Sequence, residues 1–326
     1  MGAERWMRVA ALVLGCVLTA ATAQAQQAAY PSRPLRLILP FPPGGSTDLL
    51  GRALAEKLGE SLRQPVVPEN RPGAGGNVGA EAAARSAPDG YTLVLCAPSL
   101  AISPSLYRKL NYDPLRDLVP VALVATIPNL LVVHPSVPVR TLAELAQYAR
   151  ANPGKLNFGT GGPGTSNQLA ADMFRALTKT EIVLVPYKGA ETAMLGVLSG
   201  QVQMLVIGTP ASTSHVKSGK LRALALLGKE RYPDLPDVPT AAESGMPEFE
   251  VDTWYGVLAP AGVPREIVAR LNGDLVKIMR APEMRERLAT MGIQPLSSTP
   301  DEFGEFLNGE VARWGKVVRE AGAQVE

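Results

Sequence analysis

The chain has 326 residues, a formal net charge of +2 and 46% hydrophobic residues. That length accommodates two domains of ordinary size, and the combination of apolar content and near-neutral charge is typical of a globular protein with a sizeable core. It excludes a disordered chain and the strongly basic surface that a nucleic-acid-binding protein requires.

The N-terminal segment has the three parts of a secretory signal peptide. Arg5 and Arg8 form the basic part, residues 9–20 the apolar core, and Ala23-Gln24-Ala25 a small-x-small cleavage site. The apolar core is too short for a comfortable membrane span. We therefore predict cleavage near Ala25 and export of the mature chain. Lipoprotein processing at Cys16, which follows a weak lipobox, is the alternative.

Cleavage would leave Cys96 as the only cysteine, so no intrachain disulfide could form. The stability of the exported protein must then come from its core. Cys96 ends an apolar run that begins at Tyr91, and we interpret it as a buried thiol rather than a nucleophile.

The first part of the mature chain alternates expected strands with expected helices. The apolar run from Leu35 breaks on three prolines and two glycines, and a helical pattern then begins at Ser46. Further elements are expected as strands at 66–67 and 91–96 and a helix at 78–86. This alternation predicts a parallel sheet with helices on both faces.

Residues 97–117 are expected to be irregular, and two extended runs follow on either side of Pro128. The α/β pattern then starts again, with helices at 142–150, 165–177, 190–198 and 211–217 and strands at 155–158, 182–186, 202–207 and 221–227. The last third predicts a strand at 254–259 and helices at 264–279, 282–291 and 301–320. The final helix carries an apolar stripe that we interpret as core packing.

These patterns predict an α/β protein with two domains. We place the signal peptide at residues 1–25, a discontinuous domain I at 26–124 plus 227–326, and an inserted domain II at 125–226.

Two glycine-rich turns each join an expected strand to an expected helix. They are Gly44-Gly45-Ser46-Thr47 and the segment Gly159 to Gly164. The first N–H groups of a helix are unpaired and lie at the positive end of its dipole, so such a turn suits an anion. Two of them predict a small anionic ligand gripped from two sides. Instead of binding an anion, the turn Gly44-Gly45-Ser46-Thr47 could be an ordinary tight turn with Ser46 as the helix cap.

Other chemistry is poorly supported by the residues. Gly159 to Gly164 also matches the dinucleotide pattern G-x-G-x-x-G, but Pro163 stiffens the turn and an exported protein rarely meets that cofactor. Neither turn is a P-loop, no Gly-x-Ser-x-Gly elbow occurs, and His134 and His215 are isolated. We expect no cofactor and no metal, and binding without catalysis rather than a secreted hydrolase or transferase.

Several long motifs together resemble one family, the Bug family of periplasmic solute-binding receptors that is linked to tripartite tricarboxylate transporters. The motifs are YPSRPLRLILPFPPGGSTD (30–48), ENRPGAGGNVGAEAAARSAPDGY (69–91), YDP (112–114), VPYKG (185–189) and DVPTAAESG (237–245). The resemblance covers essentially the whole mature chain. It implies a type II, Venus-flytrap periplasmic binding protein whose two domains are mostly parallel sheets flanked by helices, with a small carboxylate or related organic acid or amide in the cleft.

The resemblance also implies which residues contact the ligand, through loop amides, hydroxyls and bridging waters. In domain I these are Phe41, Gly44, Gly45, Ser46, Thr47 and Ser99. In domain II they are Thr160, Gly161, Gly164, Thr165, Ser166, Gln168 and Thr209.

Two positions depart from the family pattern, because Gln168 stands where His is common and Gln203 where Asp is common. A glutamine donates and accepts hydrogen bonds but cannot become charged near neutral pH. If Gln168 faces the cleft, the ligand is expected to differ from that of the better-known dicarboxylate receptors.

The partners implied by the resemblance are a small organic anion and either the membrane permease subunits of a tripartite transporter or a sensor domain. We expect a monomer that does not bind nucleic acid. A receptor that serves signalling alone is the alternative, since the sequence has no readable motif for the partner surface.

Overall fold

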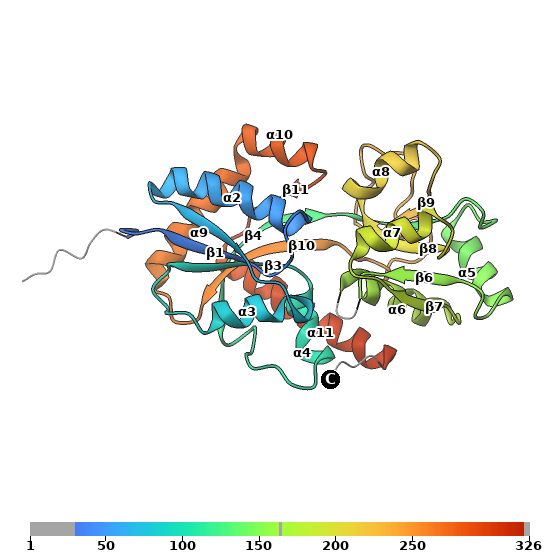
Figure 1. Ribbon diagram of the computed structural model, residues 1–326, viewed down its shortest axis with the longest axis horizontal. Coiled ribbons are helices and arrows are strands. Elements are labelled where there is room, and N and C mark those ends of the chain that lie inside the picture. Colours follow the sequence, from blue (N-terminus) through green and yellow to red (C-terminus); the bar gives the residue numbers. More distant parts are fainter. Residues whose placement is uncertain (1–29, 163–164, 323–326) are drawn as a thin grey trace, which may run out of the picture.

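The computed structural model of the protein describes residues 30–162 and 165–322. The predicted signal peptide, its cleavage site and Gly164 lie outside the described residues. Figure 1 shows two lobes side by side, each built on its own sheet. We call them the first lobe and the second lobe.

The first lobe contains a six-stranded sheet. In order across the sheet the strands are β11 (Gln294–Pro295), β4 (Leu118–Ile127), β10 (Thr253–Pro260), β3 (Thr92–Cys96), β1 (Leu35–Leu39) and β2 (Val66–Asn70). Its helices are α2 (Ser46–Leu62), α3 (Asn77–Ala84), α4 (Ser99–Leu106), α9 (Arg265–Arg280), α10 (Pro282–Thr290) and α11 (Pro300–Ala321). Buried side chains place α2, α9 and α10 on one face of the sheet and α3, α4 and α11 on the other.

The second lobe contains a five-stranded sheet. Its strands, in order, are β7 (Val183–Pro186), β6 (Asn157–Thr160), β8 (Met204–Gly208), β5 (Asn129–Val133) and β9 (Arg222–Leu226). Its helices are α5 (Leu142–Ala151), α6 (Ser166–Thr178), α7 (Ala190–Leu198) and α8 (Thr209–Lys217). Helices α5 and α6 cover one face and α7 and α8 the other.

Both sheets contain antiparallel pairs besides the parallel pairs that the sequence predicted. Strand β1 is parallel to β2 and β3, and β6 is parallel to β7 and β8. Strand β10 is antiparallel to β3 and β4, and β5 is antiparallel to β8 and β9. The two-domain α/β architecture is therefore as predicted, and its sheets are mixed.

The final helix follows its predicted role. Phe303, Leu307 and Trp314 are buried in α11, while Phe306 at the edge of the stripe is 37% exposed. Thr299 caps the helix by accepting a hydrogen bond from the N–H of Glu302, whose side chain accepts one from Thr299 in return. Helix α11 also contacts α6 of the second lobe, so one continuous core cluster includes residues of both lobes.

Helix α4 differs from the prediction that residues 97–117 are irregular. Pro104 lies inside this helix and removes one backbone donor. Leu100, Ile102 and Leu106 are nevertheless buried, and α4 packs on α11. Tertiary packing thus overrides a weak local helix signal. Cys96, at the end of β3, is buried as predicted, and burial raises the pKa of its thiol.

The chain passes between the lobes at two neighbouring places. It leaves the first sheet at Ile127 and enters the second at Asn129, and it returns at Thr253. The Nδ2 of Asn129 donates to the Val251 carbonyl oxygen (2.8 Å) and to Thr253 Oγ1 (3.1 Å), which ties the two crossings together. The predicted domain limits at 124/125 and 226/227 stay a prediction.

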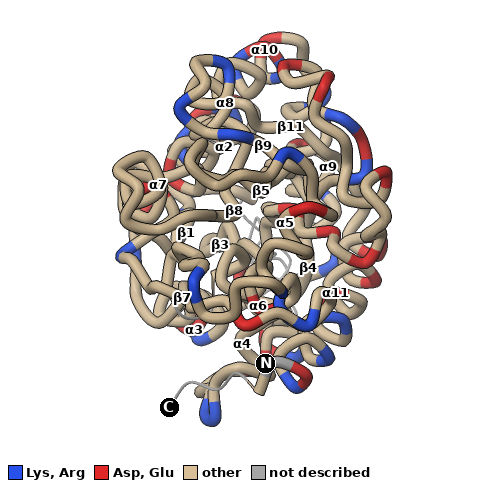
Figure 2. Tube along the Cα trace, turned by 90° about the vertical axis from the view of Figure 1, so that its right-hand side faces the viewer, with Lys and Arg blue, Asp and Glu red and all other residues tan. Residues whose placement is uncertain are grey.

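Charged residues of both signs lie on helices and on the connections between them. Figure 2 shows both signs interspersed along α9, α10 and α11. Within the described residues, no helix has the length and apolarity needed to cross a bilayer.

Candidate functional site

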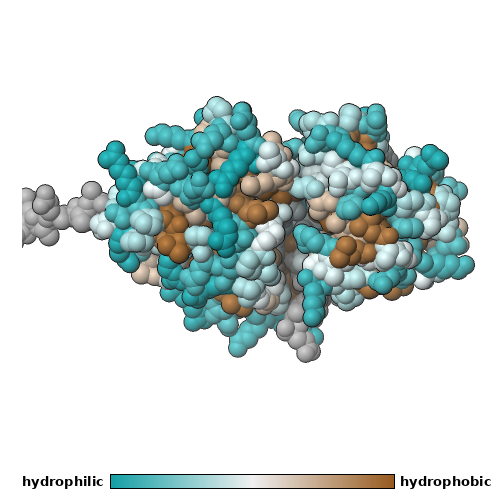
Figure 3. All heavy atoms as spheres, turned by 45° about the horizontal axis from the view of Figure 1, so that its top comes forward, coloured by the Kyte–Doolittle hydropathy of each residue, from teal (hydrophilic) through white to brown (hydrophobic). Residues whose placement is uncertain are grey.

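A cavity of about 760 Å³ lies between the lobes and is lined by residues of both. Figure 3 shows the surface hollowed along the line where the lobes meet. The volume lies within the range of pockets that hold small organic molecules, roughly 300–1,000 Å³.

Six helices begin at the wall of this cavity, because the residue preceding each one lines it. These N-cap residues are Gly45 (α2), Gly76 (α3), Pro98 (α4), Thr165 (α6), Gly189 (α7) and Gly208 (α8). None of these helices has a side-chain hydrogen bond that caps its first turn. Their N-terminal donors and dipoles therefore give the cavity a positive potential that suits an anion.

Two other helices show the contrast. Thr141 caps α5 and Thr299 caps α11 with their side chains, and neither residue lines the cavity. A capped helix has already paired one of its donors within the protein. These donors are not all free at the cavity, because Thr209 N–H of α8 donates to the Pro128 carbonyl oxygen (2.9 Å) and Leu100 N–H of α4 to that of Ala97 (2.9 Å). The start of α2 differs and is described next.

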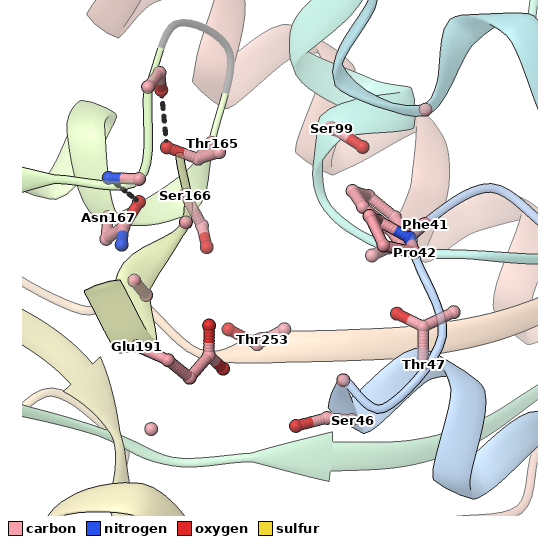
Figure 4. Close-up of a pocket in the computed structure, with 18 of the residues that line it drawn as sticks. Phe41, Pro42, Ser46, Thr47, Ser99, Thr165, Ser166, Asn167, Glu191 and Thr253 are labelled. Atoms are coloured by element: carbon pink, nitrogen blue, oxygen red, sulfur yellow. Dashed lines mark hydrogen bonds between the residues drawn. The ribbon is translucent and has the colours of Figure 1, made fainter. Parts of the chain in front are cut away.

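The first predicted loop lines the cavity. Figure 4 shows the side chains of Ser46 and Thr47 directed into the space between the lobes. Their backbone N–H groups donate to no other residue that the structure describes. Gly44 differs, because its N–H donates to Asp48 Oδ2 (3.0 Å).

Asp48 is turned away from the cavity and holds the loop in place. It is 5% exposed and accepts hydrogen bonds from Arg52, Asn70 and Gly44. The hydrogen bond from Arg52 lowers the pKa of Asp48 to about 2, and the bonds from Gly44 and Asn70 act in the same direction. The charge of Asp48 therefore stabilises the turn and is neutralised locally.

Tyr255 of β10 lines the cavity beside this loop and is 4% exposed. Burial raises its pKa to about 12, although the hydroxyl groups of Thr47 and Ser46 act in the opposite direction. The phenol therefore stays protonated and neutral, as a donor or acceptor at the wall of the site.

Phe41 and Ser99 also line the cavity from the first lobe (Figure 4). Gly76 lets these groups approach closely. A Cβ at this position would lie 3.3 Å from the Phe41 ring and 3.4 Å from Ser99 Oγ, and its φ of +100° disfavours other residues.

The second predicted loop faces the first across the cavity. Gly161, Thr165 and Ser166 line it, and Figure 4 shows Ser166 directed into it. Thr165 Oγ1 donates to the Gly162 carbonyl oxygen (2.6 Å), and the N–H of Gly161 donates to Asn167 Oδ1 (3.3 Å). These bonds fix the loop and leave the Ser166 hydroxyl without a partner among the described residues.

Three predicted contacts lie behind the wall, and Gly164 lies outside the described residues. Thr160 is 0% exposed, and its hydroxyl donates to Gln168 Oε1 (3.2 Å). Neither residue lines the cavity, and Gln168 is half-buried on α6 with its side-chain oxygen directed to Thr160. Thr209 is also 0% exposed, although its neighbours Gly208 and Pro210 line the cavity.

The polar and charged residues missed by sequence reasoning come from both lobes and from the crossings between them. They are Asn129, Asn167, Tyr187, Lys188, Glu191, Thr253 and Tyr255. Asn167 directly follows the predicted Ser166, and Tyr187 and Lys188 belong to the VPYKG motif, so the sequence contained a signal for these. Glu191 and Thr253 had none. Across the described residues, no cluster of His, Cys, Asp or Glu could hold a metal ion.

Comparisons with known proteins agree with this architecture. Residues 50–323 match the family model described as "Tripartite tricarboxylate transporter family receptor". The chain is 42% identical to Protein BugT of Bordetella pertussis over 91% of this chain and 92% of that protein. It is 38% identical to a UPF0065 protein from the tcbD-tcbE intergenic region of Pseudomonas sp. (strain P51), over 96% of this chain and 94% of that protein.

Solved structures of similar proteins include two with ligands. The R. palustris protein Rpa4515 with adipate has a TM-score of 0.82 and 36% identity, covering 91% of this chain and 100% of that chain. MatC from Rhodopseudomonas palustris with bound malate has a TM-score of 0.76 and 32% identity, covering 89% and 100%. The periplasmic binding protein BugD has a TM-score of 0.80 and 33% identity, covering 91% and 100%.

These matches confirm the resemblance that the motifs indicated, and they are to receptors rather than to enzymes. The chain belongs to the tripartite tricarboxylate transporter receptor family, whose members are periplasmic solute-binding proteins.

Proposed function

We propose that this protein captures a small carboxylate in the cavity between its lobes and releases it unchanged. The observation that carries the proposal is that the N-cap residues of six uncapped helices line one cavity. Unpaired N–H groups at a helix N-terminus bind an anion without any basic side chain. The adipate and malate of similar proteins are ligands of the same class.

The predicted site residues form the core of this proposal. From the first lobe we propose contacts by Phe41, Gly45, Ser46, Thr47 and Ser99. From the second lobe we propose contacts by Gly161, Thr165 and Ser166, with Asn167 added. Thr160 and Gln168 would act from behind, by holding the end of β6 against the start of α6.

The destination of the ligand is also part of the proposal. Membership of the family supports delivery to the membrane permease subunits of a tripartite transporter, and a sensor domain remains the other candidate. We further propose that the protein works in the periplasm as a monomer, after removal of residues 1–25.

The proposal predicts that a carboxylate stabilises the folded protein. Ligand at about 100 times its dissociation constant adds about 2.7 kcal/mol to the free energy of unfolding, because it binds the folded state alone. A thermal-shift screen of mono- and dicarboxylates, aromatic acids, amino acids and amides measures this. The protein should first be refolded from denaturant to remove any ligand it carries.

The expected result is a rise in melting temperature that grows with the concentration of one carboxylate. Recovery of that ligand unaltered after prolonged incubation would support a receptor. A screen in which no carboxylate raises the melting temperature, or in which the bound compound is converted, would contradict the proposal.

A further inference from the structure

Only two of the described residues lining the cavity carry a charge, and they are Lys188 and Glu191. Lys188 precedes α7, and Glu191 is the second residue of that helix. Glu191 forms no hydrogen bond or ion pair with another described residue. Figure 4 shows its carboxylate extending into the space between the lobes, towards Thr253.

The carboxylate of Glu191 lies close enough to the cavity wall to act on Tyr255. Its negative charge contributes to the raised pKa of that phenol, after burial. A free carboxylate at this place opposes the positive potential of the surrounding helix ends. It would repel a second carboxylate of a ligand that lay beside it.

A structural role alone accounts for part of this placement. Glu191 is the second residue of α7, where a negative charge interacts favourably with the helix dipole. Glu266 occupies the same position of α9, which also has no side-chain cap, and it does not line the cavity. Both glutamates can interact with a helix dipole, but only Glu191 can also contact a ligand. A comparison of variants at the two positions therefore distinguishes these effects.

Resting on the proposed function, we propose that Glu191 sets ligand specificity by accepting a hydrogen bond from a nitrogen-bearing group. The favoured ligand is a carboxylate whose other end, beside Glu191, carries an ammonium or a carboxamide. The helix ends and the loop hydroxyls hold its carboxylate, and Glu191 accepts from its N–H groups. A dicarboxylate of the same length places like charges together and binds more weakly.

The test compares ligands that differ at one end only. Titration calorimetry on refolded protein uses succinate, glutarate and adipate, the monoamide of each, and the ω-amino acid of each chain length. We expect the best nitrogen-bearing member to bind at least about tenfold more tightly than its dicarboxylate. Selective tight binding of the amino acids identifies the ammonium, and selective tight binding of the monoamides identifies the carboxamide.

Glu191→Gln tests the residue itself. This variant should reduce the preference over the dicarboxylate to within about threefold, mainly by improving dicarboxylate binding. Glu266→Gln is the matched control and should leave the preference unchanged. Melting curves of both variants without ligand report whether each remains folded.

A wild-type protein that binds a dicarboxylate most tightly overturns the inference while the proposed function stands. So does an unchanged preference in Glu191→Gln. Absence of binding by every member of the set, together with a negative wider screen, overturns the proposed function and this inference with it.

Discussion

The hydroxyl groups of Ser46 and Ser166 reach the cavity from opposite lobes (Figure 4). Both belong to the first residue of a helix that has no side-chain cap. A hydrogen bond to a charged group contributes about 1.5–3 kcal/mol. Ser46→Ala and Ser166→Ala are therefore each expected to weaken binding of the ligand roughly 10- to 100-fold, as measured by titration calorimetry.

Thr299→Ala is the control for this pair. It removes the side-chain cap of α11, away from the cavity, and should lower the free energy of unfolding by about 1 kcal/mol with no change in affinity. The two serine variants should show the reverse pattern. Unchanged affinity in both serine variants would contradict the assignment of these loops.

Asp252 is a titratable group at the return crossing between the lobes. Burial raises its pKa to about 7, and the charge of Glu250 acts in the same direction, while Arg313 and Lys229 oppose the shift. Its Oδ1 atom is buried without a hydrogen-bond partner among the described residues. The neutral, protonated form is therefore favoured in the folded protein below about pH 7.

This shift predicts how stability depends on pH. The folded protein binds the proton of Asp252 more tightly than the unfolded chain, in which the pKa is near 3.8. Its stabilising contribution is complete below that value and is lost as the pH rises from about 4 to about 7. Asp252→Asn, measured by thermal melts from pH 4 to pH 8, should flatten this decline and raise the melting temperature at pH 8. An unchanged profile would show that the carboxylate is solvated.

At the scale of single residues, the sequence predicted loop positions better than side-chain directions. Ser46, Thr47 and Ser166 line the cavity because they follow a turn, and turns are readable from Gly and Pro. Gln168 lies one half-turn further along α6 and faces Thr160 instead of the cavity. Glu191 could not be predicted, since its exposure to the cavity depends on how the two lobes meet.

At the scale of a helix, the dipole and the N-terminal N–H groups of α2 attract a negative charge at its first turn. A carboxylate placed at the first turn of a helix stabilises it by about 0.3–1 kcal/mol. Ser46→Asp should therefore keep or raise the melting temperature of the ligand-free protein. The same carboxylate fills the anion position, so affinity for the ligand should fall by at least about tenfold, as measured by titration calorimetry.

Ser46→Asn separates charge from size in this experiment. Asparagine has a volume similar to that of aspartate but no charge, so the Ser46→Asn variant should lose less affinity for the ligand than the Ser46→Asp variant. Equal losses in the two variants would show that steric fit, and not the potential of the helix ends, governs binding at this place.

The boundaries of an element were predictable where its hydrophobic pattern repeats over many turns. They were not predictable where the element is stabilised by contacts with residues far away in the sequence. The period of α11 was visible because its buried residues recur over many turns. Helix α4 contains Pro104, and the buried contacts that stabilise it come from α11. The insertion of β10 between β3 and β4 is likewise set by packing between segments far apart in the chain.

For the whole molecule, the arrangement of two short crossings predicts a hinge. Asn129, Val251 and Thr253 lie together at the crossings, and Asn129 also lines the cavity. We expect ligand to favour a more closed arrangement of the lobes, since contacts from both sides are then made at once. Small-angle X-ray scattering should show a smaller radius of gyration with saturating ligand.

Helix α11 sets a limit on that motion. It packs on α4 and β4 of the first lobe and on α6 of the second. Closure is therefore expected to slide α6 along α11 rather than to separate them. An identical radius of gyration with and without ligand would indicate that the lobes keep one fixed arrangement.

The two-lobe architecture followed from the sequence because strands and helices alternate in two separate blocks. The predicted limit at 226/227 stays a prediction. Near it, the N–H of Leu227 donates to the Asn129 carbonyl oxygen (2.7 Å), and the N–H of Val251 donates to the carbonyl oxygen of Leu227 (2.9 Å). These bonds tie the Pro-rich connection to the second sheet. We propose the hinge at Ile127 to Asn129 and at Val251 to Thr253.

The central claim is that helix ends of both lobes together hold one unaltered carboxylate. A crystal structure with the tightest-binding acid from the screen tests it most directly. The account predicts carboxylate oxygens about 3 Å from N–H or hydroxyl groups at the starts of α2 and α6, in a chemically intact ligand. A ligand outside this cavity, or one held by a single lobe, would contradict the account.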